Sequence, residues 1–161
     1  MFTGFQAFLT FLFFLSISFL FLSVKVVPQS KVYVIERFGK YTKTLESGLS
    51  IIIPFLDRVA HKVDILERQL PKFQISVITK DNVEVGLVST VFFRVLDASK
   101  SVYRIKNIDS AIENTAISVI RSSAGKLELD DLQSSRESMN LEIKERLSKA
   151  AEIWGVEVTR K

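Results

Sequence analysis

The first 24 residues of this chain carry no charged side chain, whereas charged residues recur throughout the chain from Lys25 onward. At about 1.5 Å per residue, about 20 apolar residues in a helix span the ~30 Å hydrocarbon layer of a bilayer. The scattered hydroxyl groups are tolerated there because they can bond to carbonyls of their own helix. We therefore predict that residues 1–27 form a membrane-anchor helix. The residues expected to face lipid are Phe11, Leu12, Phe13, Phe14, Leu15, Phe19, Leu20, Phe21 and Leu22.

A cleaved secretory signal is the alternative interpretation of this segment. Such a signal has a basic start, an apolar stretch of about 7–15 residues and a small-residue cleavage site. No Lys or Arg precedes the apolar run here, and the run is longer than that. Ser16-Ile17-Ser18 is a weak match to a cleavage site. The pattern favours an anchor.

Basic residues follow the apolar segment and none precedes it. By the positive-inside rule, this asymmetry predicts that the folded part lies in the cytoplasm. A shallow hairpin within one leaflet would leave it on the same side, but the run has no central Pro or Gly to bend it. The basic residues nearest the anchor are Lys25, Lys31, Arg37, Lys40 and Lys43.

Length and composition limit what can follow the anchor. A chain of 161 residues leaves room for one modest domain, which we expect over residues 28–161. Without cysteine, disulfides and thiolate metal sites are excluded. The net charge of +4 comes from interspersed charges with no basic stripe, so we expect no nucleic-acid partner.

The first half of the domain has the alternation and turn residues of antiparallel strands. The apolar run Ile51-Ile52-Ile53, stopped by Pro54, predicts a short buried strand. Lys80-Asp81-Asn82 joins two alternating segments and predicts a hairpin. The predicted strands are 32–38, 51–53, 58–66, 73–77 and 83–95.

The second half has helical spacing. We predict helices over 97–103, capped by Asp97, and over 109–124, stopped by Gly125. Asp130 and Gln133 predict a box-like start for a third helix, 130–154, which Gly155 ends before a further strand. The overall fold class expected is α+β: an N-terminal membrane helix, then an antiparallel β unit with about three helices.

Groups for catalysis are scarce in the sequence. The single histidine, His61, has Ala60 and Lys62 beside it, so no acid is placed to orient it as a general base. One histidine and no cysteine give little basis for a metal site, and the phosphate-binding patterns GxxxxGK[ST] and GxGxxG are missing. We expect no enzyme activity, no cofactor and no bound metal.

Two segments allow both a packing role and a contact role. The helix 130–154 can pack its apolar face on the sheet, and its charged face can also meet a neighbouring subunit. The loops around Phe38 and Phe55 can be core or can enter the membrane interface, where cations meet anionic headgroups. The candidate oligomer contacts are Arg136, Glu137, Glu142, Glu145 and Arg146. The candidate interface residues are Arg37, Phe38, Lys40, Pro54 and Phe55.

Short motifs follow one another along the chain in a distinctive order. The first are Val27-Pro28-Gln29, Glu36-Arg37-Phe38-Gly39-Lys40-Tyr41, Gly48-Leu49, Ile53-Pro54-Phe55 and Asp57-Arg58-Val59. The later ones are Thr79-Lys80-Asp81-Asn82-Val83, Phe93-Arg94-Val95, Leu127-Glu128-Leu129-Asp130-Asp131-Leu132 and Trp154-Gly155-Val156 with Val158-Thr159-Arg160. In this order the motifs resemble the SPFH (stomatin/prohibitin/flotillin, or band 7) superfamily, in its prokaryotic stomatin-like branch, and the resemblance covers essentially the whole chain.

The resemblance implies a role that no motif here supplies by itself. Members of this family are membrane-anchored scaffolds whose SPFH domain lies on the bilayer and whose subunits assemble into large rings or cages. It implies membrane lipids, copies of the same chain and membrane-protein clients as partners, with a membrane protease as a possible client. An accessory regulator of a membrane-bound protease complex is the alternative function. Relatives continue into a last strand and a coiled coil, so we expect this chain to be truncated before them.

Overall fold

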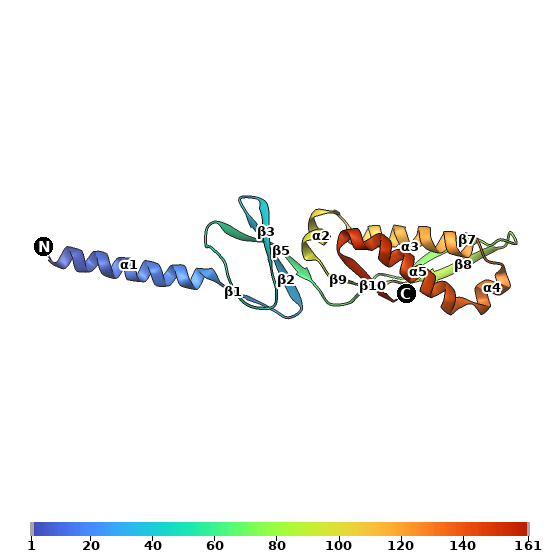
Figure 1. Cartoon of the computed structure of the whole chain (residues 1–161), viewed down its shortest axis with the longest axis horizontal. Helices are drawn as coiled ribbons and strands as arrows, with labels where there is room; N and C mark the ends of the chain where they lie inside the picture. The colour runs from blue at the N-terminus through green and yellow to red at the C-terminus, as the bar shows by residue number, and fades with distance from the viewer. Residues whose placement is uncertain (1, 161) are drawn as a thin grey trace. The chain divides into compact units, whose positions relative to one another are not determined.

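The computed structural model of the chain describes residues 2–160 (Figure 1). The chain divides into two compact units, Met1–Asp64 and Ile65–Lys161. The fold is α+β, with an apolar N-terminal helix followed by antiparallel sheets and several helices, as the sequence predicts.

The first unit begins with one unbroken helix, α1 (Phe2–Ser23). Its segment Gly4–Ser23 has a mean hydropathy of 2.2 and is not buried except at its last residue, Ser23, and α1 is the one helix in residues 2–160 long and apolar enough to cross a membrane. The anchor helix predicted to reach residue 27 ends at Ser23, because strand β1 (Val24–Val27) begins there with β-branched residues that favour an extended backbone.

Five strands complete the first unit. β2 (Lys31–Arg37) lies between β3 (Lys40–Leu45) and β5 (Asp57–Asp64) in an antiparallel sheet. β1 pairs with β4 (Gly48–Ile51) as a separate two-stranded ribbon. A small core joins the ribbon to the sheet, and it consists of Val27, Ile35, Leu45 and Ile52, with Tyr33 and Val59 packed against it.

The prediction of a buried strand over residues 51–53 is wrong. β4 ends at Ile51, and only Ile52 of the three isoleucines is buried. Because neighbouring side chains of an extended segment point to opposite faces, Ile51 and Ile53 project outward while Ile52 enters the core.

The second unit contains the predicted hairpin. β7 (Phe73–Ile78) pairs with β8 (Glu84–Ser89), from Phe73 opposite Ser89 to Ile78 opposite Glu84. The predicted strand 83–95 is divided into β8 and β9 (Phe92–Val95), and at the break the Thr90 hydroxyl donates to the Leu70 carbonyl at 2.8 Å. β9 pairs with both β6 (Arg68–Gln69) and β10 (Val156–Arg160).

Helices of the second unit cover this β structure (Figure 1). α3 (Ile108–Ala124) contacts β7, and α5 (Arg136–Ala151) contacts both α3 and β10. The apolar face predicted for the third helix is confirmed as core packing. The side chains that fill this core include Ile112, Ala116, Ile120, Ile143 and Leu147 from the helices, and Val77, Phe93 and Val158 from the strands.

The predicted single helix 130–154 is interrupted. α4 (Leu129–Ser134) and α5 are separated by Ser135, which has the non-helical backbone angles φ −108° and ψ 31°. The box-like start is wrong, because α4 begins after Glu128 without a side-chain cap. Asp130 and Asp131 instead lie in its first turn, where negative charge favours the helix dipole.

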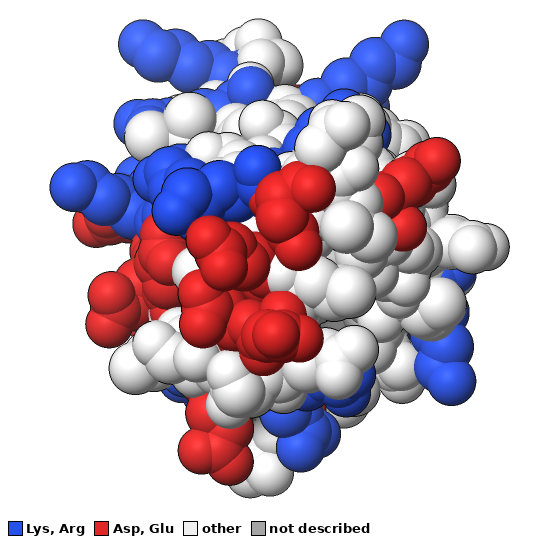
Figure 2. All heavy atoms as spheres, turned by 90° about the vertical axis from the view of Figure 1, so that its right-hand side faces the viewer, with Lys and Arg blue, Asp and Glu red and all other residues white. Residues whose placement is uncertain are grey.

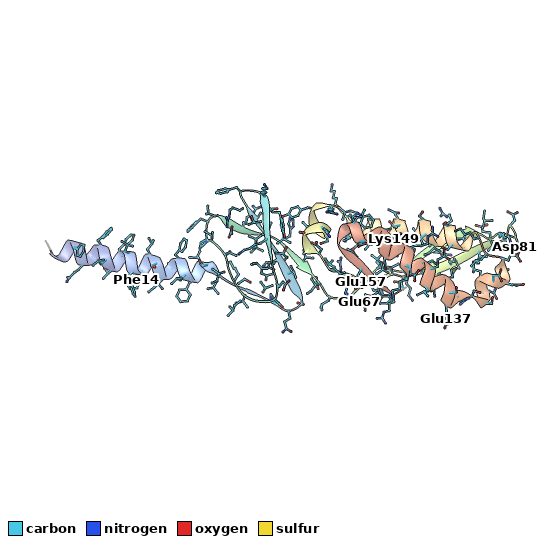
Figure 3. All side chains as sticks on the ribbon, viewed as in Figure 1. Phe14, Glu67, Asp81, Glu137, Lys149 and Glu157 are labelled. Carbon is cyan, nitrogen blue, oxygen red and sulfur yellow. The ribbon has the colours of Figure 1, made fainter. Side chains whose placement is uncertain are left out.

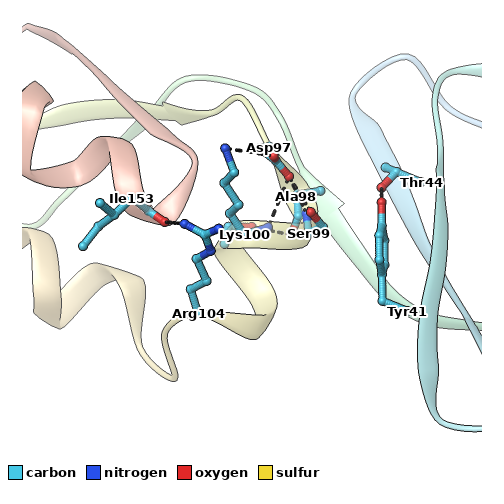
Figure 4. Close-up of polar contacts among 9 residues, drawn as sticks. Tyr41, Thr44, Asp97, Ala98, Ser99, Lys100, Arg104 and Ile153 are labelled. Carbon is cyan, nitrogen blue, oxygen red and sulfur yellow. Dashed lines mark hydrogen bonds and ion pairs between the residues drawn. The ribbon is translucent and has the colours of Figure 1, made fainter.

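The cap predicted at Asp97 is confirmed. Its carboxylate accepts the N–H groups of Ser99 at 3.0 Å and Lys100 at 3.2 Å at the start of α2 (Ala98–Tyr103) (Figure 4). These bonds, with the Ser99 hydroxyl bond as the largest cause, lower the pKa of Asp97. Arg104 after α2 donates to the Ile153 carbonyl at 3.1 Å, in the 3-10 turn η1 (Glu152–Trp154).

Gly155 ends this turn with φ 68°, and a Cβ at this position would lie 2.6 Å from the Asp97 carbonyl oxygen. We expect Gly155→Ala to destabilise the second unit by about 1–2 kcal/mol for the left-handed backbone and by about 1–3 kcal/mol more for the overlap. Fluorescence of Trp154, the only tryptophan, measures its thermal unfolding. Gly86→Ala is the matched control, because its Cβ would meet only Gln74 at an ordinary 3.6 Å. Equal melting temperatures for the two variants would contradict this account.

Candidate membrane-contact surface

The surface of α1 is apolar on every side. All nine residues expected to face lipid lie on this helix and are exposed, and the labelled Phe14 projects away from the helix axis (Figure 3). The backbone N–H and C=O groups within a helix bond to each other, so they do not need water as a hydrogen-bond partner. The apolar surface of α1 is therefore more favourable in hydrocarbon than in water.

The β1–β4 ribbon continues this apolar surface beyond the helix. Val24 lies opposite Ile51 and Val26 lies opposite Leu49, so the four side chains share one face. They are 45–77% exposed, whereas Val27 on the other face is only 3% exposed. We call the four residues the ribbon face. The ribbon face was not predicted from the sequence, although Val24 and Val26 flank Lys25 with the two-residue period of a strand.

Two loop phenylalanines add to the apolar surface of the first unit. Phe38 is 84% exposed and Phe55 is 88% exposed, so the interpretation as core is wrong for these two side chains, although Ile52 and Pro54 beside Phe55 are buried. Both have a left-handed backbone, with φ 51° and 68°, which bulky residues adopt rarely. The ring of Phe55 lies 6.5 Å from that of Phe19 on α1.

A buried carboxylate connects the two loops. Arg37, beside Phe38, donates from Nε to Oδ1 of Asp57 at 2.8 Å, and the Ile53 N–H donates to its Oδ2 at 3.0 Å. The Asp57 side chain is only 1% exposed. The Arg37 hydrogen bond is the largest cause that lowers the pKa of Asp57, and the Ile53 bond adds to it. The Arg37–Asp57 pair thus fixes where Phe38 and Phe55 lie.

The other candidate interface residues divide by exposure. Lys40 is exposed at the turn, whereas Pro54 is buried and supports the loop. Lys43 donates to the Ile51 carbonyl at 3.0 Å, which ties β3 to the ribbon. Tyr41 and Thr44 share a 2.9 Å hydrogen bond along β3 (Figure 4).

The candidate oligomer contacts on α5 are not equivalent. Glu142 pairs with Arg146 at 3.5 Å, and Arg146 also donates to the Ser123 hydroxyl of α3 at 3.1 Å, so both serve packing within the chain. Arg136, Glu137 and Glu145 are exposed, and Figure 3 shows Glu137 pointing away from the helix. These three can meet another protein.

A shallow hollow of about 380 Å³ lies in the second unit between β8 and the α4–α5 helices. Its lining includes Leu87, Ser89, Leu132, Arg136 and Met139, and the Ser89 hydroxyl is buried without a hydrogen-bond partner in residues 2–160. Figure 2 shows a mixed acidic and basic surface, consistent with the exposed Lys80, Asp81, Glu128, Asp130 and Asp131 of this unit.

The residues that could serve in catalysis or metal binding do not form a cluster within residues 2–160. His61 is an exposed residue of β5 opposite Val34. Among residues 2–160, no group of three or more His, Asp or Glu side chains is placed to hold a metal ion.

The Arg37–Asp57 pair makes a pH-dependent contribution to stability. Because the folded-state pKa of Asp57 lies below the ordinary 3.8, the contribution is complete above that pH and is lost as the pH falls through the lowered value. We expect Asp57→Asn to speed amide exchange at Ile53 at neutral pH, and to leave the β2–β5 amides protected. Glu46→Gln, at an exposed carboxylate of the same unit, should change neither. Unchanged exchange at Ile53 in Asp57→Asn would refute the assigned role.

Comparison with known proteins identifies the family to which this chain belongs. The model of the SPFH domain/Band 7 family matches residues 25–160. An uncharacterized protein of Methanothermobacter thermautotrophicus is 39% identical over 140 residues, which are 87% of this chain and 44% of that protein. Human mitochondrial stomatin-like protein 2 is 34% identical over 137 residues, or 85% of this chain and 38% of that protein. An uncharacterized Schizosaccharomyces pombe protein is 36% identical over 137 residues, which are 85% of this chain and 39% of that protein. The chain spans about two fifths of the length of these relatives, and it belongs to the SPFH/Band 7 family.

Proposed function

We propose that this chain is a non-catalytic, membrane-anchored scaffold subunit that assembles with its own copies at the bilayer and organises membrane proteins or lipids there. Residues 1–27 act as the anchor and residues 28–161 as the SPFH domain. The observation that carries the proposal is the continuous apolar surface of the first unit, from α1 through the ribbon face to Phe55. Family membership supports the same role.

The energetics favour a membrane location for the first unit. Exposed apolar area costs about 25 cal/mol per Å² relative to an apolar environment, so a helix with no buried apolar residue is unfavourable in water. Single exposed apolar residues are ordinary on soluble proteins, but a contiguous patch of this extent marks an interaction site. We place the second unit on the cytoplasmic side, because the basic residues follow the anchor.

Assembly is the second part of the proposal. The exposed Glu137 and Glu145 of α5 make no ion pair within residues 2–160 and can pair with basic residues of a neighbouring copy. Interfaces in closed homo-oligomers repeat one pairing around the ring, so a modest contact is multiplied.

Fractionation tests the anchor. We expect the full chain to stay in the membrane pellet after alkaline carbonate extraction, with an intact mass that includes residues 2–23. A chain that lacks residues 2–23 should leave that pellet in greater part. Recovery of the gene product in the soluble fraction, trimmed of its leader, would refute the anchor and would show that the apolar segment is a cleaved signal sequence.

Charge reversal tests assembly. After mild detergent extraction we expect a large homo-oligomer by size-exclusion chromatography with light scattering, and Glu137→Lys with Glu145→Lys should shift it towards smaller species. The control, Glu46→Lys with Glu84→Lys, changes the net charge equally at exposed sites away from α5. A small wild-type species would contradict the assembly part. Co-purification of a membrane protease at fixed stoichiometry would favour the alternative function, an accessory regulator of that protease.

A further inference from the structure

A second hollow, of about 290 Å³, lies in the first unit where α1 ends. Its apolar wall includes Leu22 of α1 with Ile52, Pro54 and Phe55, and Lys25 and Arg58 contribute its positive charges. The Ile52 N–H donates to the Ser23 carbonyl at 2.8 Å, which fixes the end of the helix against this segment. We propose that this hollow binds the headgroup of an anionic glycerophospholipid, an inference that rests on the proposed membrane location.

The two cations are available for an anionic group. Lys25 is half-buried, and its ammonium makes no hydrogen bond or ion pair within residues 2–160. The side chain of Arg58 is 78% exposed, and its contact with Glu36 is long, at 3.4 Å. A guanidinium has five N–H donors, so Arg58 can keep Glu36 and still donate to a phosphate.

The negative groups near the hollow are already compensated. Asp57 lines it, but its carboxylate is engaged by Arg37 and by the Ile53 N–H. The Ser23 carbonyl lies at the negative end of the helix dipole and is occupied by the Ile52 N–H. The local balance of charge therefore favours an anion.

The apolar wall distinguishes a lipid from a soluble anion. A free phosphate would bind Lys25 and Arg58 but would leave Leu22, Phe55 and Pro54 without a partner. A phospholipid supplies a phosphate for the cations and acyl chains that continue along α1, past Phe19, which lies beside Phe55. The choline of a zwitterionic headgroup would bring a third positive charge to the site, so phosphatidylglycerol should be preferred over phosphatidylcholine.

Native mass spectrometry of the full chain, released from mild detergent with equal amounts of phosphatidylglycerol and phosphatidylcholine, tests the proposal. We expect one phosphatidylglycerol per subunit to be retained preferentially. Lys25→Gln with Arg58→Gln should lower its retention about a hundredfold, since each of the two charge-assisted hydrogen bonds contributes about tenfold. Lys31→Gln with Lys62→Gln removes the same charge from the same unit outside the hollow and should retain the lipid.

The outcomes separate this site from the proposed function. Both double variants keep α1, so both should remain in the membrane pellet; loss of the wild type from that pellet would instead refute the anchor. Equal retention of the two lipids by the wild type, or equal phosphatidylglycerol retention by both double variants, would overturn the headgroup site. Displacement of the lipid by an equal concentration of inorganic phosphate would also overturn it, because the apolar wall would then contribute nothing. The melting temperature of each variant establishes that it is folded.

Discussion

The buried carboxylate of Asp57 is the interaction on which the membrane-contact surface depends. It joins the end of β2, through Arg37, to the backbone of Ile53 after β4. Phe38 and Phe55 lie beside these attachment points in a left-handed backbone that a bulky residue does not adopt without support. The Arg37 side chain is partly exposed, so solvent weakens the ion pair, whereas the Asp57 side chain is only 1% exposed. The effect of the pair is positional, because it holds two aromatic side chains and the end of the ribbon in one arrangement.

The two units differ in how much of their apolar surface lies in a core. The second unit buries a large set of apolar side chains between α3, α5 and the strands, as the core of a folded domain does. The first unit has a small core, and much of its apolar area lies outside that core, on α1, the ribbon face and the two loops. A unit with so small a core gains stability when its exposed apolar surface contacts an apolar environment outside the protein. We regard the bilayer as that environment, so that membrane contact contributes to the stability of the first unit as well as to its location.

The sequence was sufficient where one local signal dominates. The uncharged run predicts α1, the polar turn at Lys80-Asp81-Asn82 predicts the β7–β8 hairpin, and Asp97 predicts the N-terminal cap of α2. It failed at Ile51-Ile52-Ile53, because a continuous apolar run is expected both for a strand buried on two faces and for one with one face towards lipid. It also failed at Ser135, where helical periodicity continues across a break. The candidate headgroup site combines Lys25 with Arg58, residues far apart in sequence, and only the folded register brings them to one hollow.

The ribbon limits how deep the first unit can enter the bilayer. Backbone N–H and C=O groups at an unpaired strand edge cannot enter hydrocarbon without losing hydrogen bonds, whereas a helix can. β1 and β4 pair only with each other within residues 2–160, so each has an outer edge that needs water or headgroups. In the membrane location that we propose, the strands would therefore lie at headgroup level, and only the ribbon face and Phe55 would reach the acyl region. Since Lys25 is a residue of β1, its ammonium would then lie at the height of the lipid phosphates.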